Sequence, residues 1–486
     1  MRKKYTILFL LLSLFLGANT LIFALPQEQE HAIQSFIDEA RRISRATGIS
    51  VAVVIEDEVY FFSSGLAHRI DEIFASEETL WELASVSKAF TALGVLYLEE
   101  QGFLSLNDSI ADHLPWLTFR YNGQLINMQE VRLYHLLHHT SGLPLATESA
   151  QGTLKSGVEA LIDAELAFFP GEHFSYGNGN FNILGLIIET VSRQSYDSFM
   201  EERIFRPLGM TQTFANQDHA KATGRLAQGY ATQFIFFPVS RDAPEAEIRE
   251  NIPTGYIISS AKDMARWMKI QLGLVADMPE VFRAIVPKSH GQEQWVAEWE
   301  SYYAAGWLVS ADGLRIEHGG NNPSFTTFAL LHPEEQIGIT VLVNSCQTID
   351  TALIANSIVG ILNGDFVVRY SMSAMQIMDM IFTIITILSL AFVIVFFIHG
   401  QRRRKQSEGH PLTKNRIILI TLWSLITLAL VVVLLILPSL MLSGSRSWSD
   451  VLTWVSLSFL TMPLALVSLS ASITWFVAFP RHTVSA

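Results

Sequence analysis

Residues 81–90 read WELASVSKAF, a mostly apolar stretch in which Lys88 follows Ser85 by three positions. Residues three apart share one face of a helix, with Cβ atoms about 5–6 Å apart. A serine hydroxyl is a weak nucleophile until a neighbouring base removes its proton. The stretch therefore allows two interpretations, an amphipathic helix with one polar stripe or a serine hydrolase with a lysine base. Because the pattern is short, it favours the plain helix when taken alone.

The N-terminus, residues 1–27, reads as a secretory signal or as an uncleaved membrane anchor. Arg2, Lys3 and Lys4 precede an apolar run from about residue 5 to residue 25, which is the order found in signal peptides. The length of the run is compatible with cleavage after Ala24 and also with an anchor. Both interpretations predict that the following residues leave the cytoplasm.

The C-terminal region, residues 371–486, holds three apolar runs at about 377–399, 417–442 and 451–479. Each exceeds the roughly 20 residues that span a bilayer, and their low charge disfavours a buried soluble bundle. The connection between the first two runs carries six basic residues against one acidic residue. Basic loops stay on the cytoplasmic side, so residues 28–366 are predicted to form a domain on the outer side.

Charge divides the chain in the same way. The 486 residues carry a net charge of -13. Residues 28–370 alone hold 22 basic and 43 acidic side chains, a balance of −21. Such a domain should avoid nucleic acid and anionic lipid headgroups, and it would not repel a cationic or neutral substrate. The single cysteine, Cys346, allows no intramolecular disulfide and reads as a small core residue.

The order of elements in the middle segment predicts an α+β fold. Residues 29–46 read as a helix, and residues 49–65 read as two strands around a turn. Helical runs follow at 85–101, 180–193 and 260–272, then four short strands between 303 and 345, then a helix at 350–363. Early and late strands would share one antiparallel sheet flanked by helices, with the helical middle as a second lobe. A site is expected between the lobes.

Two polar stretches downstream of Ser85 change its interpretation. FSYGNGN, residues 174–180, alternates Tyr176 and Asn178 in a Gly-rich loop, and EHGGNNP, residues 317–323, places His318 before two glycines. The order Ser-x-x-Lys, Tyr-x-Asn and basic-Gly-Gly resembles the penicillin-recognising serine hydrolases, in the branch of class C β-lactamases, D-amino-acid peptidases and related esterases. The resemblance covers nearly all of residues 28–366. Lys-Thr-Gly is frequent at the third motif of that family, and the variant here occurs in its peptidase and esterase branches.

The resemblance implies a mechanism and a set of residues. Ser85 would attack a carbonyl carbon and form an acyl-enzyme. Lys88 and Tyr176 would transfer protons, and either one is an acceptable general base. Apolar neighbours would depress the pKa of Lys88. The backbone N–H groups of Ser85 and Asn321 would form the oxyanion hole. No metal or other cofactor is required, since no H-E-x-x-H pattern occurs.

Other polar residues near these motifs keep two interpretations each. Asn178 is a substrate contact or a turn residue, and His318 is a binding group or the cap of a strand end. Gly319 and Gly320 would let a substrate backbone approach the strand closely. Glu82 could balance Lys88, cap the helix, or bind a substrate amine or amide. The remaining histidines of the middle region read as packing or loop residues: His135, His138 and His139.

The whole architecture also resembles the membrane-anchored peptidases that activate non-ribosomal peptide prodrugs of the colibactin type. WELASVSKAF, FSYGNGNFNILG and HGGNNPSF match segments of that group, with 91 residues from Ser85 to Tyr176. Those enzymes remove an N-acyl-D-asparagine cap. Their pocket has Ser and His where this chain has Asn178 and Asn251, while Glu82 is retained. The likeness to that group is therefore stronger in the domain architecture than in the substrate pocket.

Three hypotheses follow. The first is a serine peptidase in a bacterial inner membrane, with its domain on the periplasmic side, that acts on an N-acyl or D-amino-acid-containing peptide. The second is a penicillin-binding protein or β-lactamase, and the third is a membrane sensor that only binds. The expected partners are a small peptide or acyl-peptide and membrane lipid, without nucleic acid. Three spans exceed what anchoring requires, so contact with a second copy or an exporter is a further hypothesis.

Overall fold

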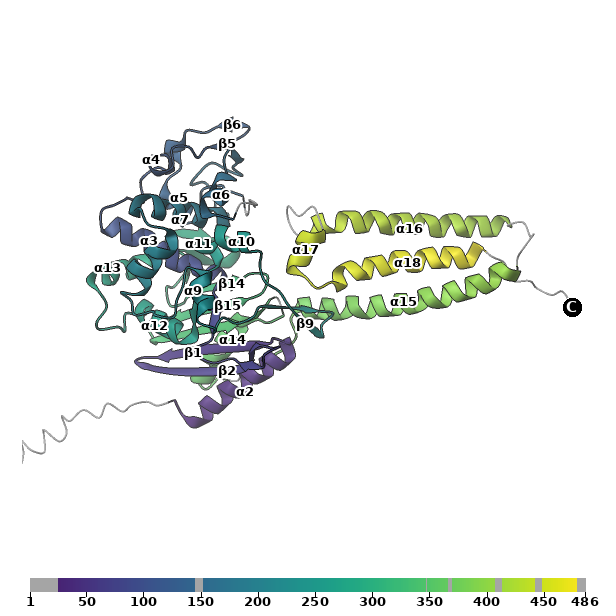
Figure 1. Cartoon of the computed structure of the whole chain (residues 1–486), viewed down its shortest axis with the longest axis horizontal. Helices are drawn as coiled ribbons and strands as arrows, with labels where there is room; N and C mark the ends of the chain where they lie inside the picture. Colours follow the sequence, from purple (N-terminus) through teal and green to yellow (C-terminus); the bar gives the residue numbers. More distant parts are fainter. Residues whose placement is uncertain are drawn as a thin grey trace, which may run out of the picture.

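The computed structural model describes residues 25–144, 152–346, 348–365, 369–406, 413–441 and 448–478. The predicted signal up to residue 24 and part of the basic connection, residues 407–412, lie outside the described residues. Figure 1 shows a folded domain from which a group of long helices extends. The domain and the helices are connected by the start of α15 (Ala374–Gln406).

The core of the domain is a nine-stranded sheet in the order β11-β12-β13-β14-β15-β16-β1-β2-β3. β1 (Gly48–Ile55) pairs antiparallel with β2 (Glu58–His68) on one side and with β16 (Ile337–Val343) on the other. The early and late strands thus share one sheet, which confirms the predicted α+β fold. The other strands of this sheet are β3 (Ile73–Phe74), β11 (Gln294–Val296), β12 (Ser301–Tyr303), β13 (Leu308–Ser310), β14 (Ile316–Asn321) and β15 (Thr326–His332).

Helices cover both faces of the sheet. α2 (Gln27–Ser44) and α14 (Thr351–Leu362) lie on one face, where they share a core with β1, β15 and β16. The apolar residues of α2 recur at three- and four-residue spacing, which gives one buried stripe: Ile33, Phe36, Ile37 and Ala40. α12 (Ala261–Gln271) packs on the opposite face against β1 and β16.

The helical middle forms the second lobe, next to the sheet. Its central helices are α3 (Ser87–Glu100) and α7 (Asn178–Ser192), which pack on each other and are buried over most of their length. The remaining helices are α4 (Ile110–His113), α5 (Leu133–Leu137), α6 (Leu154–Glu159), α8 (Tyr196–Phe199), α9 (Gln217–Ala222), α10 (Glu245–Glu250), α11 (Ile252–Gly255) and α13 (Glu280–Ser289), with the short turns η1 (Ala84–Val86), η2 (Met128–Glu130), η3 (Met200–Phe205) and η4 (Ala297–Trp299).

Three small sheets complete the domain. β4 (Leu80–Glu82) pairs with β10 (Ile258–Ser260) and leads directly into η1. β8 (Tyr230–Gln233) and β9 (Phe237–Ser240) form a hairpin beside β17 (Ser345–Cys346). The third sheet lies in the helical lobe and contains β5 (Phe119–Tyr121), β6 (Gln124–Leu125) and β7 (Ala164–Glu165).

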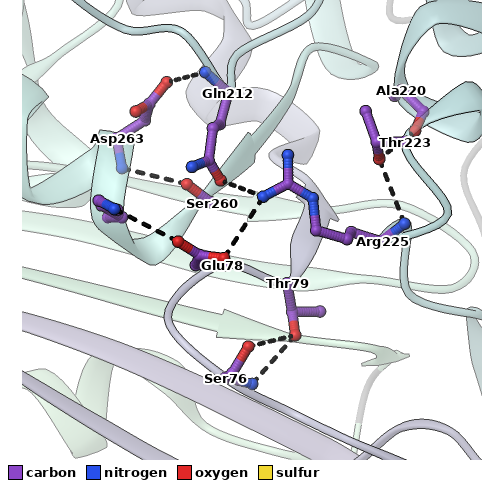
Figure 2. Close-up of polar contacts among 10 residues, drawn as sticks. Ser76, Glu78, Thr79, Gln212, Ala220, Thr223, Arg225, Ser260 and Asp263 are labelled. Carbon is purple, nitrogen blue, oxygen red and sulfur yellow. Dashed lines mark hydrogen bonds and ion pairs between the residues drawn. The ribbon is translucent and has the colours of Figure 1, made fainter.

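A polar network holds the segment that enters β4 (Figure 2). The carboxylate of Glu78 lies 3.6 Å from Arg225 and 3.3 Å from Lys262. Arg225 also donates to the side chain of Gln212 at 3.0 Å, and the Gln212 N–H donates to Asp263 at 2.6 Å. Exposed ion pairs of this kind contribute little each, but together they join β4 to the start of α12. The strand that precedes the Ser-x-x-Lys stretch is therefore tied to two other segments.

Three C-terminal helices are long and apolar enough to cross a membrane: α15, α16 (Lys414–Met441) and α18 (Ser458–Ala478). A short helix, α17 (Trp448–Trp454), precedes α18. α18 packs against both α15 and α16, and the three run side by side in Figure 1. Most of their large side chains face outward, which is the arrangement of helices whose surroundings are apolar.

Candidate active site

Ser85 lies in the turn η1, at the point where β4 ends and α3 begins. The preceding residue, Ala84, has a φ of 45°, in the left-handed region that costs a non-glycine residue about 1–2 kcal/mol. Such outliers cluster at functional sites, where the surrounding structure holds them. Here Thr327 donates its hydroxyl to the Leu83 carbonyl at 2.6 Å, and the Leu83 N–H donates to the Ile257 carbonyl at 2.8 Å. Strands on both sides thus hold the turn that presents Ser85.

Two glycines allow this close approach. A Cβ at Gly320 in β14 would lie 2.7 Å from the Leu83 carbonyl oxygen and 2.9 Å from the Ser85 nitrogen. A Cβ at Gly306, which has a φ of +79°, would lie 2.5 Å from the Ala89 nitrogen. Gly320 was predicted to admit a substrate, and the structure gives it a further role in packing β14 against the nucleophile turn. At Gly319 a Cβ would meet only the Phe328 ring, at ordinary contact distance.

Lys88 is fully buried and its Nζ has three oxygen neighbours. These are Ser85 Oγ at 3.2 Å, Asn178 Oδ1 at 3.0 Å and the Thr254 carbonyl at 2.8 Å. Burial lowers the pKa of Lys88 well below its ordinary value, because the charged form loses its hydration. A neutral amine has two N–H donors and one lone pair. The two carbonyl oxygens can only accept, so they take both donors, and the lone pair is left facing the Ser85 hydroxyl.

Tyr176 lies on the other side of the same serine. Its ring centre is 4.8 Å from Lys88 Nζ, and its hydroxyl hydrogen-bonds with Ser85. Burial raises the pKa of Tyr176 above its ordinary value and outweighs the opposing effect of that hydrogen bond, so the group is a neutral phenol at physiological pH. The structure therefore brings Ser85, Lys88 and Tyr176 together around one hydroxyl group.

A chain of hydrogen bonds runs behind Tyr176 to β14. His139 Nδ1 accepts from the Asn180 amide at 2.9 Å, so its Nε2 carries the proton and donates to Tyr303 Oη at 3.2 Å. Tyr303 then donates to His318 Nε2 at 3.3 Å, and His318 Nδ1 donates to the Gly319 carbonyl at 2.7 Å. Burial lowers the pKa of His318 to about 3, which keeps the ring neutral. Both ring nitrogens of His318 are thus bonded within the protein.

The other predicted site residues lie on the edges of this centre. Asn178 begins α7 and accepts from Lys88, so it supports the base directly. Asn321 ends β14 and is exposed, and its backbone remains a predicted oxyanion donor. Asn251 accepts from the Asn182 amide at 2.8 Å.

Glu82 is buried at the end of β4 and does not contact Lys88. Its carboxylate accepts from Asn322 at 2.6 Å and from Gln217 at 3.3 Å. Burial raises the pKa of Glu82 to about 7, against the effect of these two donors. The residue lines a cavity of about 370 Å³ together with two further acidic residues, Asp242 and Glu245, and two basic ones, Lys221 and Arg241.

Three contributors were absent from the sequence-based prediction. Thr254 supplies a backbone carbonyl, Gly306 supplies space, and Tyr303 connects two histidines. A backbone carbonyl has no residue-type signature, so sequence inspection had no signal for Thr254. The run of Tyr303 and Gly306 within YYAAGW was visible, but it read only as a strand.

A serine with a buried lysine base, set between an antiparallel sheet and a helical lobe, defines the penicillin-recognising class of serine hydrolases. The chain belongs to the Beta-lactamase family, whose model matches residues 33–359. It is 32% identical to Protein flp of Staphylococcus aureus (strain NCTC 8325 / PS 47) over 465 residues, 91% of this chain and 90% of that protein. It is 26% identical to Penicillin-binding protein 4 of Amycolatopsis lactamdurans over 66% of this chain and 86% of that protein.

Solved structures show the same fold. The octameric penicillin-binding protein homologue from Pyrococcus abyssi superposes with a TM-score of 0.61 at 24% identity, over 69% of this chain and 78% of that one. A class C beta-lactamase gives a TM-score of 0.61 at 21% identity, over 70% and 98% of the two chains. At these identities the likeness concerns the fold.

Proposed function

We propose that this protein is a membrane-anchored serine peptidase or amidase that hydrolyses an N-acyl or D-amino-acid-containing peptide through an acyl-enzyme on Ser85. The observation that carries the proposal is the bonding of Lys88. Its Nζ lies 3.0 Å from Asn178 Oδ1 and 2.8 Å from the Thr254 carbonyl oxygen, which can only accept, and 3.2 Å from Ser85 Oγ, so the neutral amine directs its lone pair at the Ser85 hydroxyl. A site that only binds a ligand has no need of a buried, neutral lysine beside a serine.

The chemistry follows from this geometry. Ser85 Oγ attacks the substrate carbonyl carbon while its proton passes to Lys88 Nζ. The negative charge on the carbonyl oxygen is stabilised by the backbone N–H groups of Ser85 and Asn321. The C–N bond then breaks, and the proton travels through Tyr176 to the leaving amine. Water attacks the acyl-enzyme by the reverse arrangement and releases the acid.

Two features support the substrate class. The domain is strongly acidic, and the Glu82 carboxyl faces a cavity lined by acidic and basic side chains alike, so a substrate that offers an amine or amide group to Glu82 would be favoured there. The helices α15, α16 and α18 would hold the domain at the outer face of a bacterial inner membrane. The match to Protein flp extends over 91% of the chain, beyond the hydrolase domain alone.

The test uses the full-length protein in detergent micelles with a library of N-acyl-D-amino-acid peptides, followed by mass spectrometry. We expect cleavage by the wild type, an acyl adduct on Ser85, and neither in the Ser85→Ala variant. Full cleavage by Ser85→Ala would refute the mechanism.

Activity as a penicillin-binding protein or β-lactamase is the second candidate, favoured by the 26% identity to Penicillin-binding protein 4. A fluorescent penicillin separates the two, because rapid labelling of Ser85 without cleavage of the peptide library would favour this candidate. Absence of reaction with every serine-directed phosphonate would favour the non-catalytic sensor.

A further inference from the structure

Six large apolar residues lie exposed on two neighbouring loops of the hydrolase domain, each between 49% and 79% accessible. We call them the apolar rim: Ile70, Ile73 and Phe74 around β3, and Phe236, Phe237 and Val239 in the β8–β9 hairpin. The two loops are in contact, since Arg69 donates its guanidinium to the Pro238 carbonyl at 3.4 Å and its N–H to Tyr230 Oη at 2.7 Å. Soluble surfaces rarely gather so many large apolar groups without a partner.

The hairpin is bound to the C-terminal helices at its turn. The N–H of Phe234 donates to Ser456 Oγ at 2.8 Å, and the N–H of Ile235 donates to Asp379 Oδ2 at 2.7 Å. Both turn residues have positive φ, 50° and 60°, which is unfavourable for a β-branched residue such as Ile235. These contacts retain the turn against α15, and Figure 1 shows β9 beside the start of that helix.

The position of the apolar rim relative to the bilayer follows from the number of residues along α15. The basic residues 402–405 stand at the far end of the helix. Counting back the roughly 20 residues that cross the hydrocarbon core reaches the neighbourhood of residue 382, about one turn from Asp379. Ile235 contacts Asp379, so the hairpin lies at the boundary between hydrocarbon and headgroups. Aromatic residues are favoured at that boundary.

We propose that the apolar rim is a lipid-binding surface, inserted among the headgroups and upper acyl chains of the leaflet from which the hydrolase domain protrudes. The attachment would be apolar, because the domain carries an excess of acidic residues that disfavours electrostatic binding to anionic lipid. Locally, Arg45 lies 6.0 Å from the Phe236 ring and can reach a lipid phosphate. Asp71 and Glu72, in the same loop as Ile70, are exposed, and the Asp71 carboxylate lies 3.0 Å from His68 Nδ1, so both can stay among the headgroups. The rim would hold the active site at a set height above the bilayer.

The test places single cysteines in the full-length protein, reconstituted in phosphatidylcholine nanodiscs and labelled with a small fluorophore. The background is Cys346→Ala, which removes a buried thiol. The test sites are Phe74→Cys and Phe237→Cys. Ile387→Cys, on an outward face of α15, is the matched lipid control, and Leu125→Cys, on β6 at the end of the helical lobe away from the main sheet, is the matched water control.

We expect the labels at positions 74 and 237 to be quenched by lipids that carry a nitroxide near the headgroup and to lose quenching by aqueous iodide, as at position 387. The label at position 125 should show the opposite. If iodide quenches positions 74 and 237 as strongly as 125, the rim is in water and the proposal fails. Protection from both quenchers would also overturn it, because a protein surface, such as a second copy, would then cover the rim.

Discussion

Lys88 and Glu82 stand three residues on either side of Ser85, and burial drives both toward the neutral form. Their partners differ in kind. Lys88 has two carbonyl acceptors and a hydroxyl, whereas Glu82 has two amide donors and acidic neighbours. The environment of Lys88 stabilises an amine lone pair aimed at the nucleophile. That of Glu82 holds a carboxylate beside a cavity. Opposed environments of this sort divide the roles of titratable groups in a site, so the proposed function assigns proton transfer to Lys88 and substrate binding to Glu82.

The largest effect is expected on the Lys88 side. Lys88→Met keeps a long apolar side chain and removes the base, so kcat/KM should fall by about 10²–10⁴-fold, the usual worth of general base catalysis. Steady-state hydrolysis of the best peptide gives the value. Thermal unfolding should change little, because removal of a buried amine is offset by the loss of the donor to Asn178 Oδ1 and the Thr254 carbonyl. A loss of less than tenfold would place the base elsewhere.

Asn178→Asp tests whether the uncharged surroundings of Lys88 matter, because it places a carboxylate next to the amine. A carboxylate at the position of the present amide oxygen, 3.0 Å from Nζ, would raise the pKa of Lys88 by stabilising its charged form. Because only the neutral amine is a base, the acid limb of the kcat/KM profile should move to higher pH. The rate on that limb should fall by about tenfold or more.

Asn178→Ser is the matched control, because it shortens the side chain without adding charge. Its acid limb should stay where the wild type has it, even if the rate is lower. Equal displacement of the limb in both variants would show that Lys88 is not the titrating group.

A smaller effect is expected behind the site, at Tyr303. Tyr303→Phe leaves His139 Nε2–H and His318 Nε2 without their partner, and an unsatisfied buried group costs about 1–3 kcal/mol. We expect a lower free energy of unfolding and a severalfold loss in kcat, because β14 loses part of its support. Nitrogen-15 NMR of the histidines should report a shifted Nε2 resonance at His318, which has lost its donor, while Nδ1 stays protonated on the Gly319 carbonyl.

The difference between the two sides also shows what sequence can reveal. The strands β1, β2, β14, β15 and β16 follow from alternating and continuous apolar runs, and Ser85, Lys88 and Tyr176 follow from motif order. The acceptor for Lys88 is a backbone carbonyl of Thr254, and the state of His318 depends on Tyr303, fifteen residues earlier. Carbonyls and hydrogen-bond directions leave no trace in residue types. Glu82 was visible in the first stretch, but its role depends on Asn322 and Gln217, which only the fold brings near.

The smallest effect, and the one that tests the Glu82 side, is that of Glu82→Gln. The pKa of Glu82 is raised in the folded state from 4.5 to about 7. A carboxyl with a raised pKa contributes most stability below its unfolded pKa, and that contribution is lost as pH rises from about 4.5 to about 7. The Gln variant does not titrate, so its melting temperature relative to wild type should rise by a few degrees across that window, where ~1 kcal/mol corresponds to about 2–4 °C.

Activity gives the second readout for Glu82→Gln. If the carboxylate binds a substrate amine, the wild-type KM should fall as pH rises through about 7, because the charged form then predominates. The variant should show a flat KM over the same range and a kcat within a fewfold of wild type. A fall in kcat as large as that of Lys88→Met would contradict the separate roles of Lys88 and Glu82. Glu82 would then take part in proton transfer.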